Sequence, residues 1–414
     1  MLLLSHPTGN TFFRAAARAF FSNGMLAELN STICWHPNSY LSKLIPPSLS
    51  VQLARRSFDD IPVNLQHSHS AREYLRLLSS YFKIGLFQQH EVGFLSIDSL
   101  YCSFDRHVAS RLESIRNCQA IYAYEDCALA TFSSGKRLGL YCLYDLPIGY
   151  WQSAQHIFSE EKDLNPDWAC TITGLKDSTV KLARKDEELS LADHIIVPSH
   201  FVRETLLTYN ATSAPISVVP FGSPPALAEA PPRNDSLPLR ILYVGSLGQR
   251  KGLSYSIEAV DSLDFEATFT LIGKRGPYQC KPLDSALNRF NWIETLPHSK
   301  ILEQMRNHDV LLLPSLFEGY ALVISEALSQ GLPVIATPNS GATESIRDGI
   351  EGFIVPIRDS YAITQKLSLL NFDRDLLARM RLSCLARASQ LNWRQYESSL
   401  SRLVCRLLHH EPLT

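Results

Sequence analysis

The chain has 414 residues, of which 45% are hydrophobic and only 19% are charged. This composition excludes a disordered protein and predicts large buried cores. Lys and Arg together number 39 and Asp and Glu 41, so the net charge of −2 does not attract nucleic acid to the surface as a whole. At roughly 150 residues per domain, the length suggests two domains.

Three further features of the sequence bear on the location of the protein. The nine cysteines are scattered and include no CxxC pair, a distribution typical of reduced thiols in the cytosol. The segment 1–7 has no basic region and only a short apolar run, unlike a signal peptide. No apolar stretch approaches the roughly 20 residues that span a bilayer. We therefore expect a cytoplasmic protein that is soluble, or at most peripheral on the inner face of the membrane.

Short apolar runs alternate with helical patterns along the chain, which predicts an α/β protein built from parallel βα units. A helix follows residue 10, with Asn10 as its N-cap, and Gly331 ends a helix expected at 321–330. Strands are expected at 2–4, 31–34, 120–124, 138–144, 194–197, 216–219, 240–244, 267–272, 310–313 and 334–336. Two doubly wound halves of this kind hold a ligand cleft at the C-terminal ends of their strands.

A proline-rich segment divides the two halves, because five prolines between residues 221 and 238 allow neither a helix nor a central strand. We expect a first domain at 1–222, a linker at 223–238, a second domain at 239–390 and a final helix within 391–414.

Two acidic residues follow the strand expected at 310–313. Glu318 lies in a turn, and Glu326 lies in the second turn of the next helix. Their carboxylates can accept hydrogen bonds from hydroxyls, but acids are also common near a helix start because of its dipole. The amides that begin this helix predict an anion site and belong to Gly319, Tyr320, Ala321 and Leu322.

Two glycine-rich loops follow neighbouring strands of the second half. Glycines let a backbone approach a phosphate closely, and nearby cations offset its charge. The spacing matches neither GxGxxG nor the P-loop. The residues that point to phosphate binding are Gly245, Ser246, Arg250 and Lys251 in the first loop and Gly273 in the second.

Taken together, these motifs make residues 314–356 resemble the C-terminal half of family 4 glycosyltransferases. Glu318 and Glu326 stand in the family's signature of two glutamates separated by seven residues, and 244–252 is similar to its diphosphate-binding loop. The other matching motifs are Phe317-Glu318-Gly319-Tyr320, Gly331-Leu332-Pro333, Gly341-Ala342-Thr343-Glu344 and Asp348-Gly349. The resemblance implies the GT-B architecture, in which two Rossmann-like domains face a central cleft.

What the resemblance implies about activity is a retaining transferase that moves a sugar from a UDP-, GDP- or ADP-linked donor to a glycan or lipid-linked acceptor. No cofactor and no divalent metal are expected. Glu318 and Lys251 take the catalytic roles, on the sugar hydroxyls and on the leaving diphosphate respectively. Donor-binding roles fall to Glu326 at the ribose and to Gly319, Tyr320, Ala321, Leu322, Gly245, Ser246, Arg250, Gly273 and Gly9.

This chain departs from the family pattern at Ser246, where an arginine is common. Arg250 replaces that arginine or is a surface charge. The first domain takes the acceptor side, and the final helix crosses back to it as in relatives. His6 and Glu125 follow strands there as acceptor-side candidates, although a packed histidine and a helix cap explain them as well.

Several alternatives stay open. A sugar-nucleotide epimerase, a glycan phosphorylase and a catalytically silent sugar- or nucleotide-binding partner would share this fold. The basic, amphipathic segment 71–87 suggests contact with anionic lipid, but we favour an ordinary helix packed on the sheet. His67 and His69 show no ligand partner in the sequence, and Asp373 is expected to cap a helix rather than bind a metal.

Overall fold

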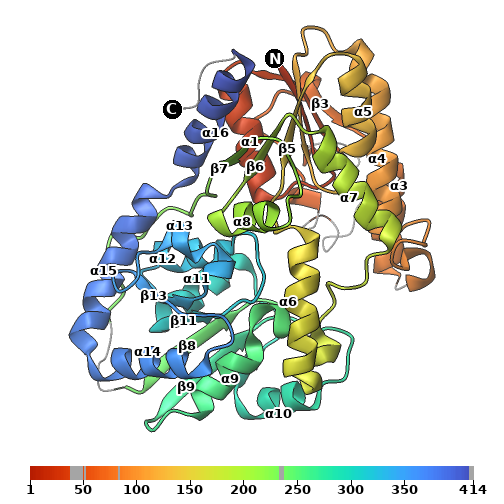
Figure 1. The fold of residues 1–414 in the computed structure, drawn as a ribbon. Coiled ribbons are helices and arrows are strands. Elements are labelled where there is room, and N and C mark those ends of the chain that lie inside the picture. The colour runs from red at the N-terminus through yellow and green to blue at the C-terminus, as the bar shows by residue number, and fades with distance from the viewer. Residues whose placement is uncertain (38–49, 51–52, 83, 233–236, 410–414) are drawn as a thin grey trace.

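The computed structural model describes all residues except 38–49, 51–52, 83, 233–236 and 410–414. Its two parallel sheets lie one above the other in Figure 1, each with helices on both faces, which confirms the expected α/β architecture. The proline-rich segment lies between the two sheets, and 233–236 of that segment fall outside the described residues.

The first sheet has seven strands in the order β3-β2-β1-β4-β5-β6-β7, and every neighbouring pair is parallel. Two expected strands are misplaced, because β2 ends at Ser31 rather than beginning there and β5 begins at Tyr141, after a turn at Gly139. The strands are β1 (Leu2–Ser5), β2 (Leu26–Ser31), β3 (Gln66–Ser68), β4 (Ala120–Tyr124), β5 (Tyr141–Asp145), β6 (His194–Val197) and β7 (Ile216–Val218).

The second sheet has six parallel strands in the order β10-β9-β8-β11-β12-β13. Its two edge strands, β10 and β13, are only three residues long, too short to produce an apolar run in the sequence. The strands are β8 (Leu239–Val244), β9 (Ala267–Ile272), β10 (Asn291–Ile293), β11 (Val310–Leu313), β12 (Val334–Ala336) and β13 (Gly352–Ile354).

Helix ends follow local rules. Asn10 caps α1 by accepting the amide of Phe13 at 2.9 Å, and Asp373 caps α15 in the same way, as expected. The described helices of the first half are α1 (Thr11–Ser22), α3 (Ala71–Tyr81), α4 (Ile97–Arg111), α5 (Leu129–Arg137), α6 (Trp151–Leu164), α7 (Thr179–Leu191) and α8 (His200–Thr208). Those of the second are α9 (Leu253–Asp261), α10 (Lys281–Arg289), α11 (His298–Asn307), α12 (Leu322–Ser329), α13 (Ala342–Ser345), α14 (Ser360–Phe372), α15 (Arg374–Gln390) and α16 (Trp393–Leu408).

Short 3-10 turns connect these elements and complete the described secondary structure. Two of them matter for the site, η5 at the end of α6 and η6 after β8. The turns are η2 (Val63–Leu65), η3 (Gly85–Gln88), η4 (Leu112–Ser114), η5 (Pro166–Thr171), η6 (Gln249–Lys251) and η7 (Pro338–Ser340).

Helix α6 joins the two halves on one side of the molecule, where Figure 1 shows it reaching down beside the second sheet. Glu161 near its C-terminal end is fully buried. Its carboxylate accepts hydrogen bonds from Gln249 Nε2 at 2.6 Å and Tyr255 Oη at 3.0 Å, and it pairs with Arg358 Nε at 2.8 Å. All three partners belong to the second half, so one buried carboxylate of the first half connects the two.

Helix α16 joins the halves on the opposite side. The chain leaves the second sheet through α15, and α16 then packs along α1 of the first half (Figure 1). Its buried residues Tyr396, Leu400 and Val404 share one hydrophobic cluster with Phe13 and Phe20 of α1. This apolar contact ties the last described helix to the first.

Replacing Leu400 with alanine should lower the free energy of unfolding by about 2–5 kcal/mol, because the fully buried side chain would leave a cavity between α16 and α1. Urea denaturation measures the change, and hydrogen exchange should quicken in α1. The matched control is Leu382→Ala on α15, where 62% exposure of the leucine limits the change to within about 0.5 kcal/mol. Equal losses for the two variants would contradict the packing role.

Candidate functional site

The loop after β11 and the turn η6 after β8 bring three charged residues together. The Oε2 atom of Glu318 lies 2.6 Å from Lys251 Nζ and 2.5 Å from Arg250 NH1. The side chains of Lys251 and Glu318 are 10% and 17% exposed, so the pair is largely shielded from water. The structure thus unites the two residues to which the sequence gives catalytic roles, and it adds Arg250 to them.

Burial and charge oppose one another in this cluster. Burial, the largest influence, favours a neutral Glu318, but Lys251 and Arg250 together hold its pKa below the ordinary value. Burial lowers the pKa of Lys251, against the attraction of Glu318, and Arg250 lowers it further. Lys251 and Arg250 therefore already share one carboxylate, that of Glu318, and a second anion that binds to these cations would encounter it.

Glycines set the backbone that carries these cations. Gly252 follows Lys251 with a φ of 67°, and a Cβ there would lie 2.0 Å from the carbonyl oxygen of Pro314. A Cβ on Gly273 would lie 1.7 Å from the carbonyl oxygen of Gly245. The two glycine-rich loops therefore pack directly on one another and on the end of β11, and side chains at these positions would separate them.

The first half of the chain also positions η6. The amide of Gln249 donates to Thr171 Oγ1 at 2.9 Å, in addition to the hydrogen bond from its side chain to Glu161. Gln249 immediately precedes Arg250 and Lys251, so contacts across the interface fix the turn that presents both cations.

A second group surrounds Glu326, whose Oε1 lies 2.9 Å from His298 Nε2. Both residues line a cleft of about 680 Å³ that runs between α12, α11 and the start of α1. Gly9 lines the same cleft, where a Cβ would lie 3.0 Å from the carbonyl oxygen of Arg55. The structure thus brings two predicted donor-binding residues together at some remove from Glu318, on the walls of one cleft.

The cleft contains residues that the sequence did not suggest as site residues, Arg14 and Arg55. Burial and the neighbouring arginines lower the pKa of Arg14. Arg14 stands four residues after Asn10, so the helical period could have placed it on the same face as the helix start. Arg55 comes from a segment with no periodic pattern, and nothing local in the sequence indicates its position.

The loop from Glu318 to Leu322 is tightly held. The amides of Glu318 and Ala321 donate to the carbonyl oxygens of Asn339 and Ser340, each at 2.9 Å. The hydroxyl of Tyr320 accepts from Ser345 Oγ at 2.9 Å, and its ring is buried. Leu322 lines the larger cleft. The Ala321 amide therefore already has an acceptor in the second half. The anion site expected at this helix start would have to use the amides of neighbouring residues.

Gly319 brings this loop against the first half. Its carbonyl oxygen accepts from Ser199 Oγ at 2.7 Å, and a Cβ would lie 1.7 Å from the carbonyl oxygen of Pro147. The neighbouring Phe317 packs into a small cluster with Phe158 and Ile172. The predicted sugar-binding loop is thus itself part of the contact between the halves.

The remaining predicted residues lie outside the Glu318 cluster and the cleft around Glu326, and one of them lines a second, smaller hollow. Ser246 is exposed, and its carbonyl oxygen accepts from Tyr243 Oη at 2.9 Å, while the Gly245 amide donates to Ile272. Arg250 lines a hollow of about 130 Å³ together with Lys185 and Asp177 of the first half. Arg250 is therefore not merely a surface charge, because it meets both Glu318 and this hollow.

The two acceptor-side candidates differ in setting. His6 is packed among Phe13 and Tyr124, and burial lowers its pKa to about 3, so the ring is neutral. Glu125 lies 3.3 Å from Lys185 Nζ, and burial raises its pKa against the attraction of that lysine. Glu125 thus reaches the hollow through Lys185, whereas His6 is held in the packed start of α1.

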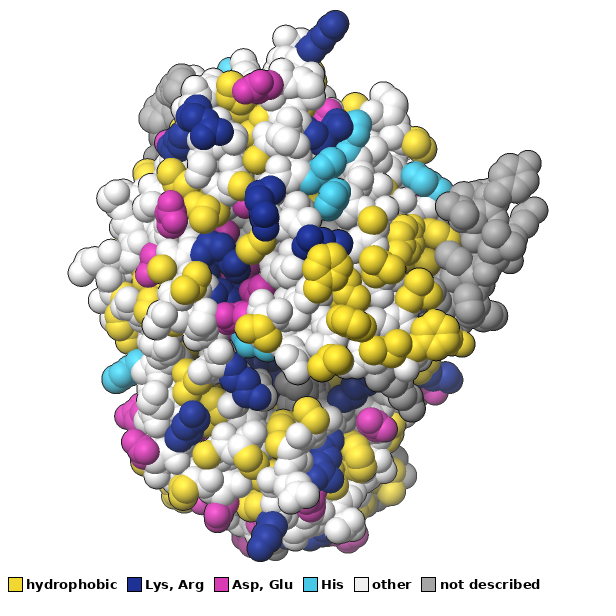
Figure 2. Space-filling view, turned by 90° about the vertical axis from the view of Figure 1, so that its right-hand side faces the viewer, with side chains coloured by type: hydrophobic (Ala, Val, Ile, Leu, Met, Phe, Trp, Pro, Cys, Tyr) yellow, Lys and Arg dark blue, Asp and Glu magenta, His cyan; other side chains and the backbone are white. Residues whose placement is uncertain are grey.

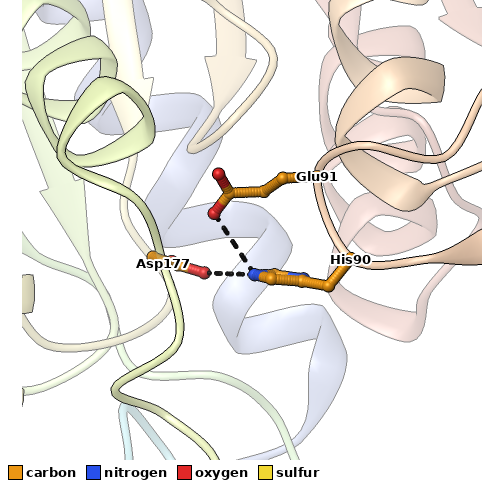
Figure 3. A group of neighbouring side chains, drawn as sticks. All are labelled: His90, Glu91 and Asp177. Carbon is orange, nitrogen blue, oxygen red and sulfur yellow. Dashed lines mark hydrogen bonds and ion pairs between the residues drawn. The ribbon is translucent and has the colours of Figure 1, made fainter.

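Metal-ligating types gather at one place within the described residues, at His90, Glu91 and Asp177 (Figure 3). His90 Nε2 lies 3.2 Å from Glu91 and 3.1 Å from Asp177. Asp177 is also paired with Lys181 Nζ at 3.0 Å, so an ammonium group already offsets its charge. We interpret the group as an ion-pair network that ties the loop after η3 to the start of α7.

The comparisons with known proteins agree with this architecture. Residues 238–371 match the family model described as "Glycosyl transferases group 1". The amylovoran biosynthesis glycosyltransferase AmsK of Erwinia amylovora is 31% identical over 149 residues, which is 32% of this chain and 36% of AmsK. The chain spans less than half the length of the curated relatives it matches.

Solved structures are similar over nearly the whole chain. Sucrose-phosphate synthase from Thermosynechococcus elongatus aligns with a TM-score of 0.68 and 16% identity, covering 99% of both chains. HepE from Anabaena, in complex with UDP, aligns with a TM-score of 0.63 and 14% identity, covering 98% of both chains.

Among the described residues no helix is both long and apolar enough to cross a bilayer. The fold expected from the sequence is confirmed, because both sheets match the architecture of the solved glycosyltransferases. The chain therefore has the GT-B fold, and its residues 238–371 match the family model of the group 1 glycosyltransferases.

Proposed function

We propose that this protein transfers a sugar from a nucleotide-diphosphate donor to a glycan or lipid-linked acceptor, with retention of the anomeric configuration. The observation that carries the proposal is the buried cluster of Glu318, Lys251 and Arg250 between the two halves. Breaking the bond between a sugar and a diphosphate leaves negative charge on the departing oxygen, and preorganised cations stabilise that charge.

In this proposal Lys251 and Arg250 bind the diphosphate and stabilise it as it leaves. They now share the carboxylate of Glu318, which the arriving diphosphate would replace as their partner. Glu318 is then free to accept hydrogen bonds from the hydroxyls of the sugar. Before the donor arrives, the two cations hold the pKa of Glu318 below its ordinary value, so the carboxylate is ionised at neutral pH.

Glu326 is proposed to hold the ribose diol of the donor. It lines the larger cleft, whose other wall includes Gly9 and the start of α1. Arg14 and Arg55 add positive charge to this cleft, which suits an anionic nucleotide. That HepE was solved in complex with UDP supports a uridine nucleotide as the first donor to test.

The acceptor side is proposed to be the smaller hollow, where Gly149 and Trp151 of the first half face Phe317 and Arg250 of the second. Lys185, paired with Glu125, supplies polar groups for an acceptor hydroxyl there. The name of AmsK refers to biosynthesis of the polysaccharide amylovoran, which supports a growing glycan as the acceptor. We propose that the reaction takes place in the cytoplasm and needs no divalent metal.

Lys251→Ala and Glu318→Gln should each lower turnover by at least ~100-fold, because each removes charge or hydrogen bonding at the departing diphosphate or the sugar. Sugar transfer from a radiolabelled donor to extracted glycans measures the effect. Lys300→Ala is the matched control, since this exposed lysine lies on α11, where its ammonium group pairs with Glu303 at 2.7 Å.

Near wild-type transfer by both site variants would overturn the site assignment. Three other outcomes of such assays would each indicate one of the rival functions. Donor conversion without acceptor would indicate an epimerase, a requirement for inorganic phosphate a phosphorylase, and donor binding without turnover a silent binding partner. Full turnover in the presence of EDTA is expected from a metal-independent site.

A thermal-shift panel with UDP, GDP and ADP should identify the donor base, because a ligand that binds the folded state raises the melting temperature by mass action. We expect one nucleotide to raise it clearly more than the other two. Glu326→Gln should reduce that shift while leaving the melting temperature of the free protein nearly unchanged. Equal shifts for all three nucleotides in both proteins would contradict a base-selective site at the cleft.

His298 predicts a pH dependence of nucleotide binding. Its hydrogen bond to Glu326, opposed by burial, raises the pKa of the imidazole above its ordinary value. The protonated pair is thus complete below about pH 6.5 and is lost as the pH rises through the raised pKa. A ribose diol that competes for Glu326 should bind more tightly as the pH rises from about 6 to about 8.

Isothermal titration of UDP across this range measures the slope. In His298→Gln the side chain no longer titrates, so the slope should be shallower than in the wild type. An unchanged slope in the variant would show that His298 does not compete for the nucleotide.

A further inference from the structure

The first half carries an exposed apolar face on the side opposite to its contact with α16. Ten large hydrophobic side chains between Leu75 and Ile97 are each 43% to 80% exposed. They come from α3, from η3 and from the loop that leads to α4, and we call them the apolar face. Figure 2 looks onto this side of the molecule and shows hydrophobic side chains gathered in one area. Single exposed leucines are common, but a gathering of this size marks an interaction surface.

Helix α3 buries Leu77 in a small cluster with Trp35 and Leu53 but leaves other leucines exposed. Glu73, on the inner side, is 1% exposed, whereas Leu75 and Leu78 are 51% and 43% exposed. The inward Glu73 is held by Arg76 Nε at 2.6 Å and by an ion pair with Arg56. The helix therefore packs inward through Leu77 and Glu73, and its other leucines remain open to a partner.

Within the segment 66–111, which supplies this face, no described acidic residue is exposed. Between residues 66 and 111 the acidic residues are Glu73, Glu91, Asp98 and Asp105. Glu91 has the most exposed side chain of the first three, at 18%, and Asp105 is 5% exposed as a residue. Each accepts an ion pair or hydrogen bonds, from partners that include His90 for Glu91 and Thr131 for Asp105.

Positive groups border the face instead. The guanidinium of Arg72 lies 4.4 Å from the ring centre of Phe94, one of the exposed aromatic residues. Arg106 is exposed on α4, whereas Arg111 at the end of α4 is paired with Glu28 at 3.0 Å. His69 and His107 stack with ring centres 4.3 Å apart and lie next to these arginines. The charge of this surface complements a negatively charged partner.

The apolar face is continuous with the mouth of the smaller hollow. Glu91 accepts the amide of Ser178 at 2.8 Å, and His90 contacts Asp177, which lines that hollow (Figure 3). A bilayer that touched the apolar face would therefore lie beside the opening in which we place the acceptor.

We propose that the apolar face docks this protein on an anionic lipid bilayer. The exposed side chains of η3 and α3 enter the interfacial region, while Arg72 and Arg106 meet the negative headgroups. The inference does not depend on the proposed transfer activity, since docking is measured on the full chain without any substrate.

Co-sedimentation of the full chain with vesicles tests this inference. The wild type should pellet with vesicles of phosphatidylcholine that contain phosphatidylglycerol, much less with phosphatidylcholine alone, and less when salt is raised. The double variant Leu86→Glu with Phe87→Glu should lower the partition coefficient by at least about tenfold, because it places two charges where apolar groups insert. Both residues are exposed, at 70% and 50%, so the fold tolerates the change.

The matched control is Tyr361→Glu with Leu382→Glu on α14 and α15 of the second half, which are similarly exposed at 71% and 62%. It should pellet like the wild type. Absence of lipid-dependent pelleting of the wild type, or an equal loss in both double variants, overturns the proposal. So does light scattering that shows a dimer which only the Leu86→Glu, Phe87→Glu variant dissociates, because the face would then join two copies of the chain.

Discussion

The buried carboxylate of Glu161 joins the two halves of this structure. It projects from α6 of the first half and is held by Gln249, Tyr255 and Arg358 of the second. A buried charge is tolerated only when it is paired, and removal of one partner from such a pair costs about 3–5 kcal/mol. Because Gln249 adjoins Arg250, the contact that joins the two halves also orients the cations of the site. Changes at the interface therefore alter the position of these cations, even though α6 contributes no residue to the cluster of Glu318, Lys251 and Arg250.

Local rules in the sequence were sufficient for most of the sheet architecture. Apolar runs placed the central strands, and Asn10 and Asp373 cap helices where their side chains predict. The errors are the misplaced bounds of β2 and β5 and the missed short strands such as β3, whose sequence Gln-His-Ser has no apolar pattern. The position of α6 between the halves was not predictable either, because it depends on Glu161 meeting residues about 90 to 200 positions away. Contacts of that kind leave no period in a sequence.

Site residues that belong to a sequence motif could be predicted, but their contacts with other loops could not. Glu318 and Lys251 were expected to act together, and the structure places them in contact. Their further partner Arg250, and the pairing of His298 with Glu326, depend on how separate loops meet. The amphipathic pattern of 71–87 is the same whether its leucines face the sheet or the solvent. The structure turns Leu77 and Glu73 inward and leaves Leu75 and Leu78 exposed, and the ion pair of Glu73 with Arg56 joins elements that the pattern does not connect.

The missing side chain of Gly319 has a consequence for how this protein can vary. The loop that holds Glu318 lies so close to the first half that a Cβ would overlap the backbone at Pro147. The two halves are thus matched in shape at the backbone itself, where side-chain substitution cannot compensate. A chimera that takes the first half from a relative would have to bring a compatible 147–149 turn with it. The first half can therefore be exchanged only together with the backbone shape of the contact beside Glu318.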